Sequence, residues 1–236
     1  MVSSLGLTYN VRMSHFEIEI KSLLGEKAKA DALVEAMKNK DKDCTLLSKN
    51  TQLNHYFTGG SIHELYEKVE HLFTGTEHEK IKTITERGND FSVRTRERDA
   101  EVLLVIKAAI DGGTSANAVS RLEFEEPVAI TLKELDDLLM TAGYTYEAKW
   151  SREREEYAYK GIAVCIDKNA GYGYLAEFET VTQDEASLPE VRAKLVALME
   201  ELGAEELKQD RLARMFAYYN ENWADYYGTE KTFNIE

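Results

Sequence analysis

The sequence predicts an α+β protein whose centre is a closed antiparallel β-barrel with a charged interior and amphipathic helices on its outside. Two observations lead to this fold class. Charged and apolar residues alternate with the two-residue period of a β-strand in one segment after another. Segments with helical periodicity lie between them, and 43% of the 236 residues are hydrophobic, which is enough for a sizeable core.

The first predicted strand is residues 16–25, where Glu17, Glu19 and Lys21 share one face and apolar residues alternate with them. An isolated strand of this kind is usually half-buried, with its charged face in water. Residues 25–41 follow with helical spacing and predict a helix that covers the sheet.

Residues 51–60 predict a short strand that ends at two glycines. A helix through residue 73 begins at Ser61, and Glu64 is placed to complete its capping box. Residues 74–90 are polar and show no obvious core face, so they predict a loop or a hairpin.

Strand patterns return from residue 91 to residue 128, first as a hairpin and then as a third strand. The charged residues that share one face of these strands are Arg94 and Arg96, then Lys107, then Arg121, Glu123 and Glu125. A second amphipathic helix begins at Thr131, with Glu134 three residues later, and ends near Gly143.

Three more strands are predicted between residues 146 and 181. Their charged face carries Arg152 and Arg154 beside Trp150, then Asp167, then Glu177 and Glu179. From residue 188 the chain is helical in two pieces, and its aromatic-rich end is expected to cover the sheet.

The repetition of this pattern argues against ordinary solvent-facing strands. Such faces would mix Lys, Thr, Ser and Gln freely, whereas this sequence concentrates arginine within its strands. The alternative is a closed barrel whose interior is the charged face. Carboxylates that face one another need a cation between them, and the oxygen-binding ions Mg²⁺ and Mn²⁺ suit that role. Clustered guanidinium groups match phosphate oxygens, so the two sets together indicate a metal-bound polyphosphate.

Composition excludes several other classes of protein. The net charge of −14 argues against a protein that coats nucleic acid, because phosphate backbones are bound by surplus lysine and arginine. Cys44 and Cys165 stand alone, which indicates a reducing compartment. No apolar segment is long enough to span a membrane, so we expect a cytoplasmic protein. Gly-rich nucleotide-binding loops are absent from the sequence.

The ordered set EIEIK, VRTR, the Lys107 strand, SRLEFEEPV, REREEY, CID and EFE resembles the CYTH superfamily, also called triphosphate tunnel metalloenzymes. The resemblance spans residues 16–179. It implies an eight-stranded tunnel that binds a triphosphate and a divalent metal, Mg²⁺ or Mn²⁺. It also implies one CYTH-like domain over residues 1–236, with a helical or loop insertion at 59–90 and a C-terminal helical segment at 187–236.

The same resemblance implies roles for individual residues. The expected metal ligands are Glu17, Glu19, Glu123, Asp167, Glu177 and Glu179. The expected phosphate-binding residues are Lys21, Arg94, Arg96, Lys107, Arg121, Arg152 and Arg154. The expected catalytic set is Glu17, Glu19, Lys21, Glu177 and Glu179. Arg214 is a further phosphate contact or a surface ion pair.

Three functions fit this site. The first is metal-dependent hydrolysis of inorganic tripolyphosphate, thiamine triphosphate or a nucleoside triphosphate, which we favour because the sequence shows no recognisable adenine pocket. The second is a class IV adenylyl cyclase, in which the ribose 3′ hydroxyl attacks and pyrophosphate leaves. The third is a polyphosphate-binding module without catalysis. The expected partner is a small-molecule triphosphate, and the sequence leaves the oligomeric state open.

Overall fold

The structure, a computed structural model, describes residues 16–109, 121–182 and 184–236. The strands are β1 (Phe16–Gly25), β2 (Thr45–Gly59), β3 (Asn89–Arg98), β4 (Glu101–Ala109), β5 (Arg121–Val128), β6 (Tyr144–Tyr159), β7 (Ile162–Asn169) and β8 (Gly173–Thr182). The helices are α1 (Lys27–Lys40), α2 (Ile62–Val69), α3 (Gly75–Arg87), α4 (Leu132–Thr141), α5 (Leu188–Glu201) and α6 (Gln209–Tyr226).

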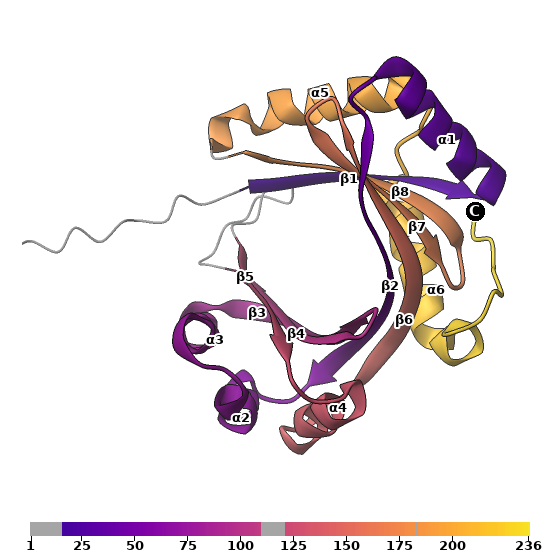
Figure 1. Cartoon of the computed structure of the whole chain (residues 1–236). Helices are drawn as coiled ribbons and strands as arrows, with labels where there is room; N and C mark the ends of the chain where they lie inside the picture. Colours follow the sequence, from indigo (N-terminus) through magenta and orange to yellow (C-terminus); the bar gives the residue numbers. More distant parts are fainter. Residues whose placement is uncertain (1–15, 110–120, 183) are drawn as a thin grey trace, which may run out of the picture.

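All eight strands form one antiparallel sheet in the order β1-β8-β7-β6-β2-β3-β4-β5. The predicted α+β class and the eight antiparallel strands are therefore confirmed. Figure 1 shows the sheet curving around a central space, with β1 on one side and β5 on the other. Within the described ranges no hydrogen-bonded ladder joins β1 to β5, so the enclosure comes from the curvature of the sheet.

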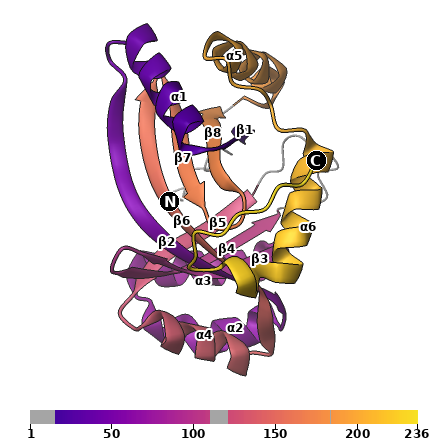
Figure 2. The same cartoon turned by 90° about the vertical axis from the view of Figure 1, so that its right-hand side faces the viewer.

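Two long strands connect the halves of this sheet. β2 has 15 residues and β6 has 16, about three times the usual strand length. One half, β1-β8-β7, carries α1 and α5, and the other half, β3-β4-β5, carries α2, α3 and α4 (Figure 2). Register shifts in the β2–β6 ladder at Leu46/Ser48 and Tyr56/Phe57 accompany the bending of the pair.

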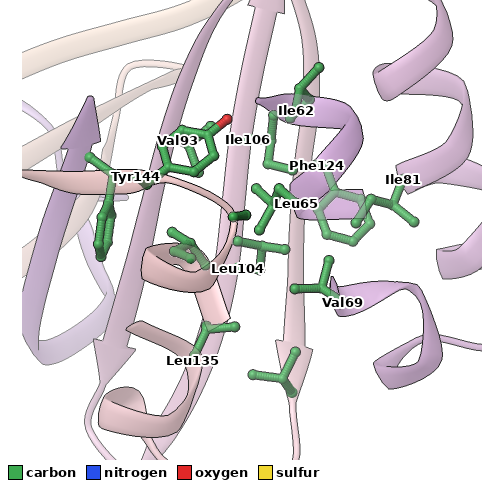
Figure 3. Packing of buried hydrophobic residues seen from close by; sticks show 14 of the residues in the cluster. Ile62, Leu65, Val69, Ile81, Val93, Leu104, Ile106, Phe124, Leu135 and Tyr144 are labelled. Carbon is green, nitrogen blue, oxygen red and sulfur yellow. The ribbon is translucent and has the colours of Figure 1, made fainter. Parts of the chain in front are cut away.

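Two large apolar cores lie on the convex side of the sheet, under helices α1 to α5, and a smaller cluster that includes Leu175 and Met215 lies under α6. In the β3-β4-β5 half, Leu104 and Phe124 pack against Leu65 and Leu135 (Figure 3). In the β1-β8-β7 half, Phe178 belongs to a second core with residues of α1 and α5. Because successive side chains of a strand alternate in direction, the charged residues of the same strands face the concave side. The predicted reversal, apolar outside and charged inside, is thus what the structure shows.

Several local predictions can be compared with the structure. The hydroxyl of Ser61 accepts from the amide of Glu64 at 3.4 Å, and Thr131 with Glu134 forms a complete capping box. The prediction of a loop or hairpin over 74–90 was wrong, because α3 occupies most of it. Its buried stripe is only Ile81, Ile84 and Thr85, too narrow to stand out in a polar segment.

The strand predicted at 51–60 begins earlier, at Thr45. Along the part of the chain that the structure describes, no helix is both long and apolar enough to cross a membrane.

Candidate active site

The concave face of the sheet forms a cavity of about 570 Å³. Ten of the residues predicted from the resemblance line it: Glu19, Lys21, Arg94, Arg96, Lys107, Glu123, Arg152, Arg154, Glu177 and Glu179. Asp167 is not among the lining residues. The side chains of Glu17 and Arg121 lie outside the described part of the structure.

The acidic side of the cavity comes from β1 and β8, which are antiparallel neighbours. Their register places Glu19 directly opposite Glu179 and Lys21 directly opposite Glu177. Lys21 Nζ is paired with Glu19 and lies 3.1 Å from Glu177 Oε1. Burial raises the pKa of Glu177, but Lys21, Arg154 and Arg152 outweigh burial and hold this pKa at about 2. Glu177 is therefore an anion at neutral pH.

Asp167 lies behind this wall and is fully buried. Its Oδ2 accepts from Arg152 Nη1 at 2.8 Å and from Arg154 Nη2 at 2.6 Å, and its Oδ1 accepts from Arg154 Nε at 2.7 Å. Both oxygens are thus occupied by guanidinium groups, so this geometry makes Asp167 a partner of the arginines. Its metal-binding role stays a prediction.

On the opposite side of the cavity, β3 and β4 supply cations, and β5 supplies carboxylates that pair with them. Arg96 Nη1 donates to Glu125 at 2.7 Å, and Lys107 Nζ lies 3.0 Å from Glu123. Burial, with Arg94 close by, lowers the pKa of Arg96 to about 10, which leaves a cation at neutral pH.

Arg94 differs from its neighbours because it takes part in none of the ion pairs found among the described residues. Its Nη1 donates to the Tyr56 hydroxyl at 2.6 Å, and its Nε is buried without a hydrogen-bond partner there. Burial raises the pKa of Tyr56, but Arg94, Arg152 and Arg96 outweigh burial and lower the pKa below its usual value. Arg94 is therefore held through a neutral hydroxyl and not through a carboxylate.

Glu125 lines the cavity from the charged face on which the sequence placed it, and the lining residues missed from the sequence are Asn54, Tyr56, Glu147, Asn169, Tyr172, Phe216 and Asn220. The period-two spacing of Asn54 and Tyr56 was a usable signal, but neutral side chains do not distinguish an inner face from a solvent face. Phe216 and Asn220 come from α6, and only packing reveals their position.

The aromatic residues of α6 do cover the sheet, as expected, and they also reach the cavity. Trp150 stacks on Tyr219 with ring centroids 3.9 Å apart. Phe216 and Tyr172 meet Trp150 at 5.3 and 5.7 Å, which gives one end of the cavity an aromatic wall. Arg214 pairs with Asp210 at 2.9 Å on the surface of α6. Of the two roles predicted for Arg214, this contact favours the surface ion pair over the phosphate contact.

The donors present suit a divalent cation that also binds substrate. Within the described ranges no three His, Cys, Asp or Glu side chains are grouped to bind a metal by themselves. Mg²⁺ commonly takes one or two carboxylates and completes its octahedron with phosphate oxygens and water. Glu19 and Glu179, opposite each other at the cavity wall, supply carboxylates of that kind.

The concave face of this curved antiparallel sheet thus gathers cations and carboxylates from several strands around one cavity. The model of the CYTH domain matches residues 82–213, which is more than half of the chain. The protein therefore belongs to the CYTH domain family.

Solved structures support the fold. A candidate adenylate cyclase from Vibrio parahaemolyticus is 17% identical, with a TM-score of 0.55 over 86% of this chain and 98% of that chain. The PH1819 protein of Pyrococcus horikoshii is 20% identical, with a TM-score of 0.56 over the same shares. A conserved hypothetical protein from Pyrococcus furiosus is 15% identical, with a TM-score of 0.54 over 82% of this chain and 93% of that chain. No curated protein matches the sequence.

Proposed function

We propose that this protein is a divalent-metal-dependent triphosphate hydrolase that binds its substrate in the cavity between the two halves of the sheet. The observation that carries the proposal is that cations from four strands, β1, β3, β4 and β6, converge on a single cavity with carboxylates from β1, β5 and β8. Members of the CYTH superfamily are typically triphosphatases or cyclases, which supports an enzyme.

Charge balance supports the need for a metal. Six cationic and six anionic side chains are found among the described lining residues, so the cavity by itself has little net positive charge. A triphosphate brings several negative charges with it. Since uncompensated charge is costly in a confined site, a divalent cation would enter with the substrate. Glu19 and Glu179 would bind this cation, with Glu177 beside them.

The protein side chains have separate tasks in this proposal. Arg94, Arg96 and Lys107 would bind phosphate oxygens from one side, while Arg152 and Arg154 would bind them from β6. These cations would stabilise the negative charge that develops on the leaving group. A carboxylate at the acidic wall would orient the attacking water toward the terminal phosphorus. The metal, when bound, would supply additional charge stabilisation as a Lewis acid.

The aromatic wall favours a second candidate, a class IV adenylyl cyclase. Trp150, Tyr172 and Phe216 lie in the same cavity as the cations, and aromatic faces suit a planar ring such as a nucleobase. Inorganic tripolyphosphate has no group that would use this wall. A ring-bearing triphosphate is the substrate that both parts of the cavity would accept, in a hydrolase or in a cyclase.

Product analysis separates the candidates. The purified protein is incubated with tripolyphosphate, thiamine triphosphate and ATP, each with Mg²⁺ or Mn²⁺, and the products are identified by chromatography. Orthophosphate supports the hydrolase, and cyclic AMP with pyrophosphate supports the cyclase. Tight binding without turnover supports a binding module and contradicts an enzyme.

Two substitutions connect the activity to the cavity. Glu19→Gln removes a carboxylate of the expected metal site and should abolish metal-dependent turnover. Lys21→Ala should mainly weaken binding of the phosphates. Glu35→Gln, at an exposed position of α1 on the convex side, is the matched control for Glu19. Unchanged kinetics in both cavity variants would contradict this assignment of the site.

A further inference from the structure

Three alternate residues of β2 face the same side as the arginines of the neighbouring strands: Gln52, Asn54 and Tyr56. We name them the β2 acceptor row. All three are uncharged, whereas the inner faces of the adjacent strands β3 and β6 are rich in arginine. Each residue of the row lies directly across from an arginine on a neighbouring strand: Asn54 from Arg96, Tyr56 from Arg94, and Gln52 from both Arg152 and Arg98.

Each pair is joined by a hydrogen bond in which the arginine donates. Arg152 Nε donates to Gln52 Oε1 at 2.9 Å, and Arg96 Nε donates to Asn54 Oδ1 at 2.8 Å. Arg94 Nη1 donates to the Tyr56 hydroxyl at 2.6 Å, and the guanidinium also lies 5.4 Å from the centre of the Tyr56 ring. One strand thus contacts three guanidinium groups through three acceptors.

A neutral acceptor affects an arginine differently from a carboxylate. Arginine has five N–H donors, so one hydrogen bond fixes the guanidinium plane and leaves the other donors available. A carboxylate would fix the plane as well, but it would also cancel the positive charge that attracts a polyanion. Gln52 and Asn54 are 4% and 3% exposed, so their contact with the arginines is enclosed.

We infer that the β2 acceptor row consists of positioning residues, which orient Arg94, Arg96 and Arg152 toward a bound polyphosphate and set its affinity by remaining uncharged. This inference rests on the proposed function. It assigns to Gln52, Asn54 and Tyr56 an indirect effect on the phosphates, exerted through the arginines that they contact.

Of the three residues, Tyr56 should have the largest effect on the orientation of its arginine. Arg96 and Arg152 also have carboxylate partners, Glu125 and Asp167, which would retain them if the acceptor were lost. Arg94 has no such partner among the ion pairs of the described residues. Loss of the Tyr56 hydroxyl should therefore leave the Arg94 guanidinium without a fixed orientation.

The first test changes charge while keeping shape. Asn54→Asp is isosteric and places a carboxylate on Arg96, and it should weaken tripolyphosphate binding about 10- to 100-fold, the value of a charged hydrogen bond. Binding of tripolyphosphate with Mg²⁺ is measured by calorimetry at several salt concentrations. The variant should also show a shallower salt dependence, because one cation has been neutralised. Asn89→Asp, exposed on β3 outside the cavity, is the matched control.

The second test removes an acceptor without adding charge. Tyr56→Phe keeps the ring and should weaken binding about tenfold, with thermal unfolding little changed. Tyr66→Phe on α2 is its control. If Asn54→Asp does not fold, Gln52→Glu makes the same charge test at Arg152. A purely structural row would shift thermal stability and leave affinity and salt dependence as they are.

The outcomes are distinct. Wild-type binding with unchanged affinity in Asn54→Asp and in Tyr56→Phe overturns this inference and leaves the proposed function standing. A wild-type protein that does not bind tripolyphosphate with Mg²⁺ or Mn²⁺ overturns both. Weaker binding in both variants, with both controls like wild type, supports the inference.

Discussion

The two halves of the sheet hold their charges in different ways. In the β1-β8-β7 half, together with β6, Lys21, Arg152 and Arg154 share Glu177 and Asp167 in one connected network whose side chains are at most 19% exposed. In the β3-β4-β5 half, Glu125 joins Arg96 and Arg98, whereas Lys107 and Glu123 form a separate pair in which Glu123 is 41% exposed. The difference indicates that the β1-β8-β7 half with β6 is a fixed framework, whereas Lys107 in the other half can exchange its weak carboxylate partner for phosphate.

The largest expected effect is the difference in stability lost when one carboxylate is removed from each half. Asp167→Ala would leave two partly buried arginines without their shared carboxylate, and it should lower the free energy of unfolding by about 3–5 kcal/mol. Glu123→Ala, the matched removal in the other half, should cost about 1 kcal/mol or less. Urea denaturation measures both. Similar losses in the two variants would show that the halves do not differ in this way.

A smaller effect is the pH dependence of stability that Glu177 gives to the β1-β8-β7 half. The pKa of Glu177 is lowered to about 2, so its ionised form stabilises the fold fully above its ordinary pKa of 4.5. This contribution is lost as the pH falls through 4.5 toward 2. Glu177→Gln should therefore be less stable than wild type by about 3 kcal/mol at pH 6, and the gap should narrow below pH 4.5. A gap that is constant with pH would contradict the assigned charge of Glu177.

In the β3-β4-β5 half, removal of Lys107 should affect substrate binding more than stability. Lys107→Gln removes a cation that is 28% exposed and paired with an exposed carboxylate, so stability should change little. The KM for the triphosphate substrate should rise about tenfold, because a charged contact to phosphate is lost. Lys82→Gln, exposed on α3, is the control for the same change of charge. A large loss of stability in Lys107→Gln would place Lys107 in a framework like that of the other half.

The smallest effect concerns the covering helices. Thr131 caps α4 over the β3-β4-β5 half through a capping box, whereas the N-cap residue of α1 over the other half, Glu26, makes no side-chain cap. Thr131→Ala should cost about 1 kcal/mol of stability, and Glu26→Ala should be close to neutral. Thermal unfolding of the two variants compares them directly.

The sequence was most informative where charge and period coincide. Glu19, Lys21, Arg94, Arg96, Glu177 and Glu179 were identified because a charge on every second residue is rare on a solvent face and is visible without coordinates. The ion pairs were not predictable, since Asp167 meets Arg154 only through the register of β6 and β7.

The sequence did not identify the neutral residues of the cavity or the narrow buried face of α3, because both depend on contacts that it does not show. Asn54 and Tyr56 have no charge to separate them from an ordinary strand surface. The helix α3 buries one thin stripe around Ile81 and Ile84, and this stripe becomes meaningful only when β5 is beside it. Both features depend on packing between segments distant in sequence, which periodicity within one segment does not contain.

The central claim is that both halves of the sheet bind one triphosphate in the cavity. Crystals grown with tripolyphosphate and Mn²⁺ test it directly, because the anomalous scattering of manganese locates the metal. The account predicts manganese beside Glu19 and Glu179, with phosphate oxygens within hydrogen-bond distance of arginines from β3 and from β6. Tripolyphosphate bound only on the convex surface, or a cavity without it at saturating concentration, would contradict the account.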